Sequence, residues 1–157
     1  MSVMRWFTRD CLTGGLADEE WQSRYDAYAA HLKDLTPRLA DGVADLHPSV
    51  TNLHDGQPCE WDYGGRTLRL RVLIGDLQHG YEWVQIEYED AELFPDRISE
   101  GLAAWPLSDC EIGADELTVS SDGHMEQRFL LWPAGEFGVR FATCQVRRAP
   151  ASADDRR

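Results

Sequence analysis

Hydrophobic and polar side chains alternate most regularly between residues 66 and 89. Alternation with a period of two is typical of half-buried β-strands, so this stretch predicts two strands. The segment 76–80 contains the glycine and aspartate that a tight turn needs, which predicts a hairpin. The apolar positions that would share one face are Leu68, Leu70, Val72, Ile74, Val84, Ile86 and Tyr88.

One register of this hairpin satisfies burial and charge together. If Leu70 lies opposite Ile86, all the apolar side chains face one way, and Arg69 lies opposite Glu87. A slip of one residue would place Arg69 opposite Ile86 and separate the opposite charges. We therefore expect the first register, in which Arg71 and Gln85 also face each other.

A second hairpin is predicted within residues 127–141 by the same kind of alternation. The Pro-Ala-Gly sequence between its strands favours a three-residue loop with Gly135 in the left-handed conformation. This loop pairs Leu131 with Phe137 and Phe129 with Val139.

The same register places Arg128 opposite Arg140, which is unfavourable because like charges across a strand pair repel each other. We therefore expect an acidic side chain between the two arginines. The candidates are Glu126, Glu136 or an acid on a neighbouring strand.

The first 48 residues have helical periodicity instead. A helix is predicted to begin at Asp18, because acidic residues there favour the positive end of the helix dipole. A second helix or a kink follows Thr36-Pro37 and ends at His47-Pro48. We expect the aromatic and aliphatic stripe of the first helix to be a packing face rather than a ligand site; it comprises Trp21, Tyr25, Tyr28, Leu32 and Leu35.

These elements together predict an α+β fold. An N-terminal amphipathic helical segment would pack on one face of a mostly antiparallel sheet of about six strands. The remaining elements would be strands at 59–63, 109–112 and 116–120 and one short helix at 95–105. Residues 1–147 would form a single domain, and residues 148–157, which lack apolar periodicity, a disordered tail.

The charge of the chain limits its partners. The sequence has 28 acidic and 15 basic residues, for a formal net charge of −13. Such a chain repels phosphate backbones and anionic membranes, so we expect no nucleic-acid or membrane partner and an attraction to basic proteins. The start has no apolar signal region, which predicts a cytoplasmic protein. Lys33 is the only lysine among the basic residues, a preference typical of a GC-rich bacterial genome.

No cofactor or metal site is predicted. The four cysteines are scattered without a C-x-x-C spacing, and no histidine stands at ligand spacing from them. We expect four buried thiols in a reducing compartment. Phosphate loops and the common hydrolase and metalloprotease motifs are also missing from the sequence.

Two groups of residues are candidates for a site. His54 and Asp55 precede Gly56, and they form either an ordinary aspartate turn or a pair for proton transfer. The open face of the predicted sheet would carry the candidate residues for binding a ligand or partner, which are Arg69, Arg71, Trp83, Glu87, Arg128 and Arg140. Trp83 either packs under a neighbouring segment or anchors a ligand or partner beside arginine.

The order of these parts resembles that of a family of uncharacterised small bacterial proteins of unknown function. The similar segments are Arg5–Thr8, Leu53–Asp55 and Glu126–Leu131. The resemblance implies the same α+β fold and no particular activity.

Three functions are compatible with these patterns. The first is an acidic interaction domain, such as an immunity-like or antitoxin-like inhibitor, that binds a basic partner without catalysis. The second is a small-molecule-binding domain or enzyme, with Arg69, Arg71 and Trp83 around an anionic ligand and His54-Asp55 for proton transfer. The third is a structural subunit of an assembly.

Overall fold

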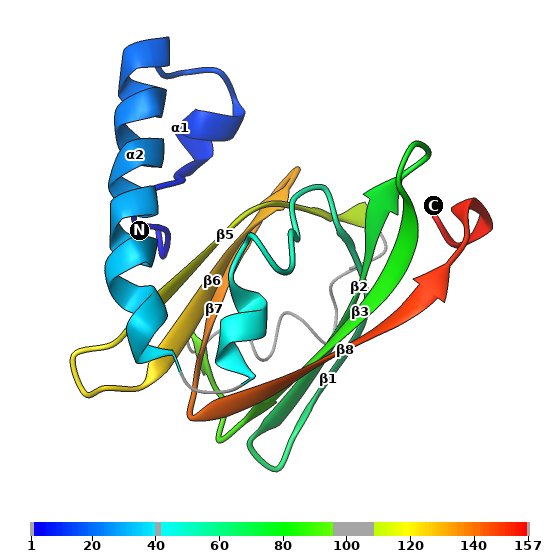
Figure 1. Ribbon diagram of the computed structural model, residues 1–157. Helices are drawn as coiled ribbons and strands as arrows, with labels where there is room; N and C mark the ends of the chain where they lie inside the picture. The colour runs from blue at the N-terminus through cyan, green and yellow to red at the C-terminus, as the bar shows by residue number, and fades with distance from the viewer. Residues whose placement is uncertain (1, 40–41, 96–108, 157) are drawn as a thin grey trace.

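The chain folds as an α+β structure with one long helix and two antiparallel sheets of four strands each (Figure 1). The computed structural model describes residues 2–39, 42–95 and 109–156. Its helices are α1 (Arg9–Leu12), α2 (Asp18–Leu35), η1 (Thr36–Arg38), η2 (Val43–Leu46) and η4 (Ala153–Asp155). Its strands are β1 (Gln57–Gly64), β2 (Thr67–Asp76), β3 (Gly80–Glu89), β4 (Glu92–Phe94), β5 (Glu111–Val119), β6 (Met125–Trp132), β7 (Glu136–Phe141) and β8 (Thr143–Ala151).

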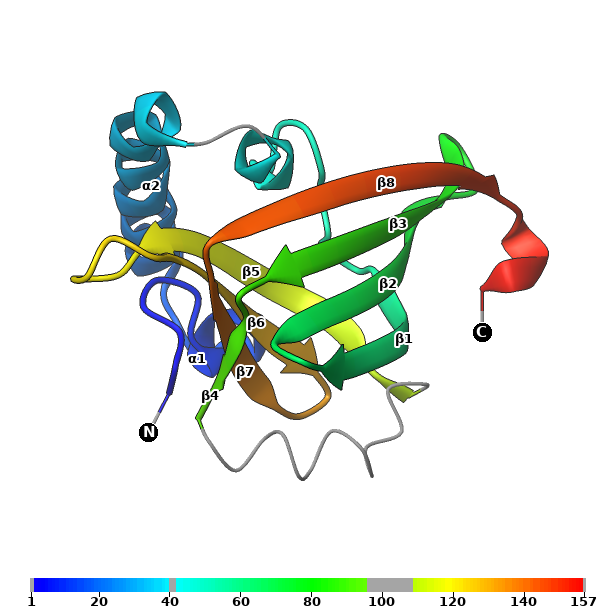
Figure 2. The same cartoon turned by 90° about the horizontal axis from the view of Figure 1, so that it is seen from below.

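The two sheets face each other and curve around a common interior (Figure 2). Their strand orders are β1-β2-β3-β8 and β4-β7-β6-β5. The chain crosses from one sheet to the other twice, at Ala91 after β3 and at Ala142 after β7, and Ala142 N donates a hydrogen bond to Glu89 O at 3.1 Å. At the opposite margin, the backbone of Ile112 forms two hydrogen bonds of 2.8 Å with Asp55 and Gly56. Backbone hydrogen bonds therefore join the sheets at both margins.

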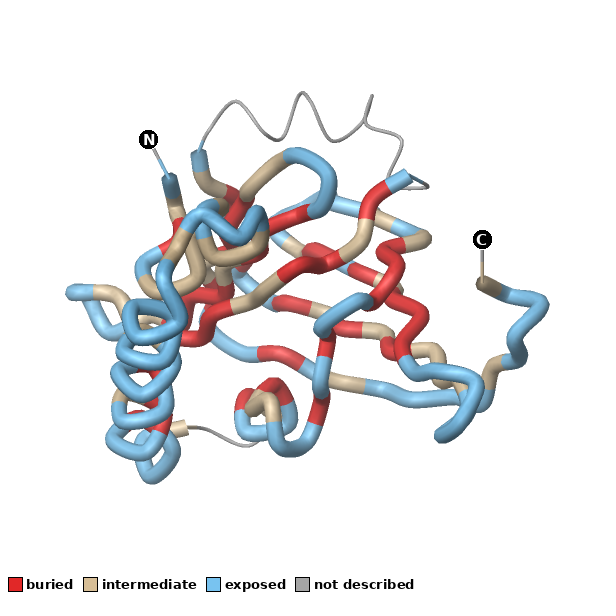
Figure 3. The backbone as a smooth tube through the Cα atoms, turned by 90° about the horizontal axis from the view of Figure 1, so that it is seen from above, coloured by how far each residue is buried: buried red, intermediate tan, exposed pale blue. Residues whose placement is uncertain are grey.

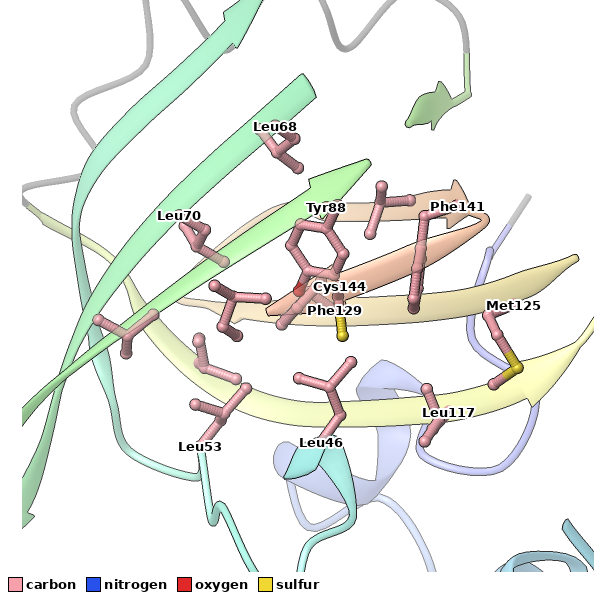
Figure 4. Close-up of a cluster of buried hydrophobic side chains, with 14 of the residues drawn as sticks. Leu46, Leu53, Leu68, Leu70, Tyr88, Leu117, Met125, Phe129, Phe141 and Cys144 are labelled. Atoms are coloured by element: carbon pink, nitrogen blue, oxygen red, sulfur yellow. The ribbon is translucent and has the colours of Figure 1, made fainter. Parts of the chain in front are cut away.

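The core lies between the sheets because the alternating apolar residues of each sheet point toward the other. Figure 4 shows this cluster, in which the rings of Tyr88 and Phe141 meet edge to face with their centroids 5.0 Å apart. Leu46 of η2 and Leu53 enter the same cluster, since both are almost fully buried. In Figure 3, buried residues are drawn in red, and many of them lie along the strands of the two sheets.

The register predicted for the hairpin β2–β3 is confirmed. Leu70 pairs with Ile86, and Arg69 pairs with Glu87. The guanidinium Nε of Arg69 lies 2.8 Å from Glu87 Oε2, so charge and burial select the same pairing.

The register predicted for the hairpin β6–β7 is wrong by two residues. Phe129 pairs with Phe137, and Arg140 pairs with Glu126 rather than with Arg128. This register relieves the like-charge conflict, because Glu126 accepts hydrogen bonds from both arginines, at 2.6 Å from Arg128 and 3.2 Å from Arg140. The expectation of an acidic side chain between the two arginines is confirmed, and of the candidates it is Glu126.

Several boundaries also differ from the predictions. The described residues contain eight strands in two sheets instead of about six in one. The two short strands expected at 109–112 and 116–120 form the single strand β5, which continues through a bulge between Ile112 and Ala114. The segment 148–151, expected to be disordered, belongs to β8, because its backbone pairs with β3 from Tyr81 to Val84. The helix expected at 95–105 lies outside the described residues.

Helix α2 begins and ends as predicted, but two of the five residues in its stripe do not pack in the core. Tyr28 and Leu32 are buried against β5 and the core, whereas Trp21 and Tyr25 are 42 % and 50 % exposed. The N-terminal half of α2 extends beyond the sheet, so these two rings have no strand to pack on (Figure 1). They stack on each other instead, with ring centroids 5.5 Å apart.

The N-terminal segment is fixed to β5 by one buried carboxylate. Glu116 is fully buried, and it accepts hydrogen bonds from the backbone N–H groups of Arg5, Trp6 and Phe7 at 2.9, 2.6 and 2.7 Å. Three consecutive amides form a concave anion-binding arrangement that stabilises the charge of a buried carboxylate. Glu116 therefore positions Phe7, which lines the groove described next.

Candidate functional site

A groove of about 730 Å³ runs beside α2, and we name it the helix groove. Its first wall is the face of α2 between Trp21 and Lys33, and its opposite wall is the segment 47–54. Residues 7–12 close one end, and residues 113–115 of β5 contribute the floor. Its volume is within the range of small-molecule sites in proteins.

Four aromatic side chains line the α2 side of the groove and the end beside it, whereas the segment 47–54 contributes mainly polar residues. The four are Phe7, Trp21, Tyr25 and Tyr28. Phe7 meets Tyr28 edge to face, with ring centroids 5.1 Å apart, and this contact fixes the inner rings. The outer rings of Trp21 and Tyr25 remain accessible, so the groove offers apolar surface to a molecule from solution.

Helix α2 is attached to β5, the edge strand of its sheet, through the backbone of Leu117. The hydroxyl oxygen of Tyr28 accepts a hydrogen bond from Leu117 N at 2.9 Å, and His31 Nε2 lies 3.0 Å from Leu117 O. Both backbone groups of Leu117 are therefore bonded to helix side chains instead of another strand, which protects the strand edge. Burial and the nearby Asp115 carboxylate raise the pKa of Tyr28, so its hydroxyl stays protonated.

The bulge in β5 lies on the groove floor. Gly113 occupies it, and a Cβ at this position would overlap the side chain of Leu12 in α1. Glycine therefore permits the close approach of α1 that closes the end of the groove. The bulge also frees the carbonyl of Gly113 to meet His54.

Among the residues that the structure describes, Asp115 is the single carboxylate that lines the groove. Its Oδ2 accepts a hydrogen bond of 3.0 Å from Gln127 Nε2, and Gln127 Oε1 in turn accepts one from the hydroxyl of Tyr88. Burial is the main cause that raises the pKa of Asp115 to about 6; the Glu116 charge acts in the same direction, and the Gln127 hydrogen bond and His54 act against it. An acid with a raised pKa in a concave apolar site is a candidate functional group.

His54 stands beside Asp115 with a defined orientation. Its Nδ1 lies 2.8 Å from Gly113 O, and its Nε2 lies 3.5 Å from Asp55 Oδ1. A carbonyl oxygen only accepts, so Nδ1 carries a proton. Asp55 adopts a positive φ of 62°, as the turn predicted for His54-Asp55 requires.

The other predicted site residues are not gathered on one surface. Arg69, Arg71, Trp83 and Glu87 lie on the outer face of the sheet β1-β2-β3-β8, in strands β2 and β3. The guanidinium of Arg71 lies 3.9 Å from the ring centroid of Trp83, and the two line a depression of about 220 Å³. Carboxylates pair with Arg69 and Arg71, at 2.8 Å from Glu87 and 3.0 Å from Glu60. Arg147, which lines the same depression, instead donates to Gln145 Oε1 at 3.5 Å.

Arg128 and Arg140 belong to the opposite sheet and bond to Glu126. The prediction that all six residues share one open sheet face is therefore wrong. His54 lines the helix groove, which does not include Trp83, so the structure does not bring the proton-transfer pair and the arginine cluster into one pocket.

Asp115 was not among the residues predicted from the sequence, although a signal was present. It has the same strand parity as Leu117 and Val119, which point inward, so it is a charged residue at an apolar position of its strand. The expectation of four buried cysteines holds for Cys110 and Cys144, whereas Cys11 and Cys59 are half-buried. Cys11 lines the helix groove.

The described ranges contain no group of three or more His, Cys, Asp or Glu side chains arranged to hold a metal ion. Across these same ranges, no helix combines the length and apolar character needed to cross a lipid bilayer. Fold and site define an α+β domain with a two-sheet core and an aromatic groove at its side. Comparison with protein-family models, curated proteins and solved structures finds no match to this chain.

Proposed function

We propose that this protein is a small-molecule-binding domain and that the helix groove is its binding site. The proposal rests on one observation: the carboxylate of Asp115 lines a cavity of about 730 Å³ that four aromatic side chains also line. A concave apolar site with a few converging polar groups is the common form of ligand pockets. The exposed stack of Trp21 and Tyr25 supports it, because exposed aromatic surface beside a cavity is costly to hydrate and favours occupation by an apolar molecule.

A fluorescence titration with the uncharged apolar dye N-phenyl-1-naphthylamine tests the proposal. We expect saturable binding to the full chain, with an affinity that falls at least about tenfold in Trp21→Ala. The matched control is Trp132→Ala, because Trp132 is 44 % exposed, close to the 42 % of Trp21, and lies outside the groove. Absence of saturable binding, or an equal loss in the two variants, contradicts the proposal.

A second candidate function is binding of a basic protein, as an immunity-like or antitoxin-like inhibitor does. The formal charge of −13 supports it, because a net acidic chain attracts a basic partner. Association with a basic partner recovered by pull-down would slow strongly as NaCl is raised from about 20 to 200 mM, since salt screens steering between opposite charges. An association rate that does not change with salt contradicts this function.

A further inference from the structure

We infer that the ligand of the helix groove is an apolar molecule that carries a protonated amine and places it on Asp115. The inference rests on the proposed function and adds the chemical class of the ligand. It is independent of the outer sheet face, where Arg69 and Arg71 are paired with acids.

The first argument is the unused hydrogen-bonding capacity of Asp115. Gln127 occupies Oδ2, whereas Oδ1 has no hydrogen-bond partner among the described residues. A carboxylate accepts several hydrogen bonds when ionised, and partial burial without them is costly. An ammonium group provides both the N–H donors and the opposite charge that this oxygen lacks.

The second argument is the surroundings of that oxygen. Tyr28 interacts electrostatically with Asp115, Phe7 packs against Tyr28, and the rings of Trp21 and Tyr25 continue the aromatic lining outward. Aromatic faces attract ammonium groups electrostatically, by about 0.5–2 kcal/mol depending on how far water is excluded. Aromatic side chains with one carboxylate therefore favour a cationic end and an apolar body in the same ligand.

The third argument concerns the other charged groups of the groove. Lys33 and His47 also line it, and Lys33 lies five residues, about 7.5 Å along the helix axis, beyond Tyr28. Around Asp115 itself stand Tyr28 from α2, His54 from the opposite segment, Gln127 from β6 and Glu116 on its own strand. Glu116 adds negative potential at this position, which favours a cation over an anion.

Calorimetric titrations with three matched probes test the inference on the full chain. The probes share one naphthalene ring and carry an aminomethyl, a hydroxymethyl or a carboxylate group. Near neutral pH we expect the amine to bind at least about tenfold more tightly than the alcohol, and the carboxylate to bind most weakly. In Asp115→Asn the amine should fall to the affinity of the alcohol, while the affinity for the alcohol changes by less than about twofold.

A pH series separates Asp115 from His54. The amine affinity of the wild-type protein should fall as the pH is lowered through about 6, because Asp115 gains a proton there. His54→Gln should retain this fall, and Asp115→Asn should abolish it.

The outcomes distinguish the inference from the proposed function. If the alcohol or the carboxylate binds as tightly as the amine, the amine class is overturned while the groove remains a binding site. If none of the three probes binds, the proposed function and the inference both fail. The inference is also overturned if the fall in amine affinity at low pH disappears in His54→Gln and persists in Asp115→Asn.

Discussion

Two neighbouring carboxylates of β5, Asp115 and Glu116, lie on opposite faces of the strand and have opposite environments. Glu116 accepts hydrogen bonds from three backbone amides, which satisfy its charge. Asp115 receives one hydrogen bond, from Gln127, and burial raises its pKa to about 6. Glu116 therefore stabilises the fold, while Asp115 retains capacity for another molecule.

The role of Glu116 is tested by Glu116→Gln. The amide has one acceptor oxygen and presents an NH₂ group to backbone N–H donors, so we expect a loss of about 2–3 kcal/mol in the free energy of unfolding. Urea denaturation measures this loss. Glu136→Gln is the control, because Glu136 also holds the N-terminal segment, through Ser2 and Val3, but is only half-buried. Its loss should stay below about 1 kcal/mol, and equal losses would contradict the special role of Glu116.

The raised pKa of Asp115 makes stability depend on pH. The folded protein holds this proton more tightly than the unfolded chain, in which aspartate titrates near 3.9. The contribution is therefore complete below about pH 4 and lost as the pH rises through about 6. Asp115→Asn has no titrating carboxyl group at this position and therefore cannot lose this contribution. Between about pH 4 and pH 6, its free energy of unfolding relative to wild type should rise by about 1–2 kcal/mol, less than the full shift implies because Asp115 is partly exposed.

Urea denaturation of both proteins across this pH range measures the difference at each value. Parallel pH profiles of the two proteins would show that the environment of Asp115 does not favour its protonated form.

At the scale of elements, the sequence predicts a strand pairing correctly when the residues of the two strands alone select one register. The hairpin β2–β3 was predicted in full because alternation and the pair Arg69–Glu87 select one register. The register of β6–β7 was missed because the hydrogen bond from Leu131 N to Gly135 O closes the turn around residues 132–134, instead of around the expected Pro-Ala-Gly at 133–135. Alternation has a period of two, so it cannot distinguish registers that differ by two residues.

The helix groove could not be predicted for a different reason. Helical spacing identifies the stripe on α2, but not how far the helix extends past the sheet that covers it. Tyr28 meets β5, whereas Trp21 lies two turns earlier, beyond the strand. Whether an aromatic residue is core or site depends here on the position of another element, which single-sequence patterns do not contain.

The attachment of β4 to β7 provides a test at this scale. The ring of Phe94 lies directly over Gly138, where a Cβ would overlap it. Gly138→Ala should cost about 1–3 kcal/mol in the free energy of unfolding, because the ring has to move away from β7. Gly64→Ala is the matched control, since Gly64 is also in a strand and has no atom within 4 Å of an added Cβ.

Thermal or urea denaturation measures both glycine variants, and the control should change stability by less than about 0.5 kcal/mol. A double-mutant cycle with Phe94→Ala completes the test. The two changes should not be additive, because removing the ring removes the overlap. Additive effects would contradict a direct contact between the ring and Gly138.

For the whole molecule, the net charge of −13 acts on stability as well as on partners. Repulsion among excess carboxylates favours expanded states, and salt screens it. The free energy of unfolding at neutral pH should therefore rise by about 1 kcal/mol as NaCl is raised from about 20 to 200 mM. The rise should shrink at mildly acidic pH, where carboxylates gain protons, and a fall in stability with salt would show that local ion pairs dominate.

The crossings at Ala91 and Ala142 determine which fragments of the molecule are viable. A fragment that stops after β4 contains a complete meander of β1, β2 and β3, but it lacks β8, the neighbour of β3, and β7, the neighbour of β4. A fragment that begins at β5 keeps β5, β6 and β7, but it leaves β8 without the strand on which it pairs. Each half would expose an unpaired strand and the apolar face that the other half covers. The two sheets are therefore not separable folding units, and the groove beside α2 exists only in the intact chain.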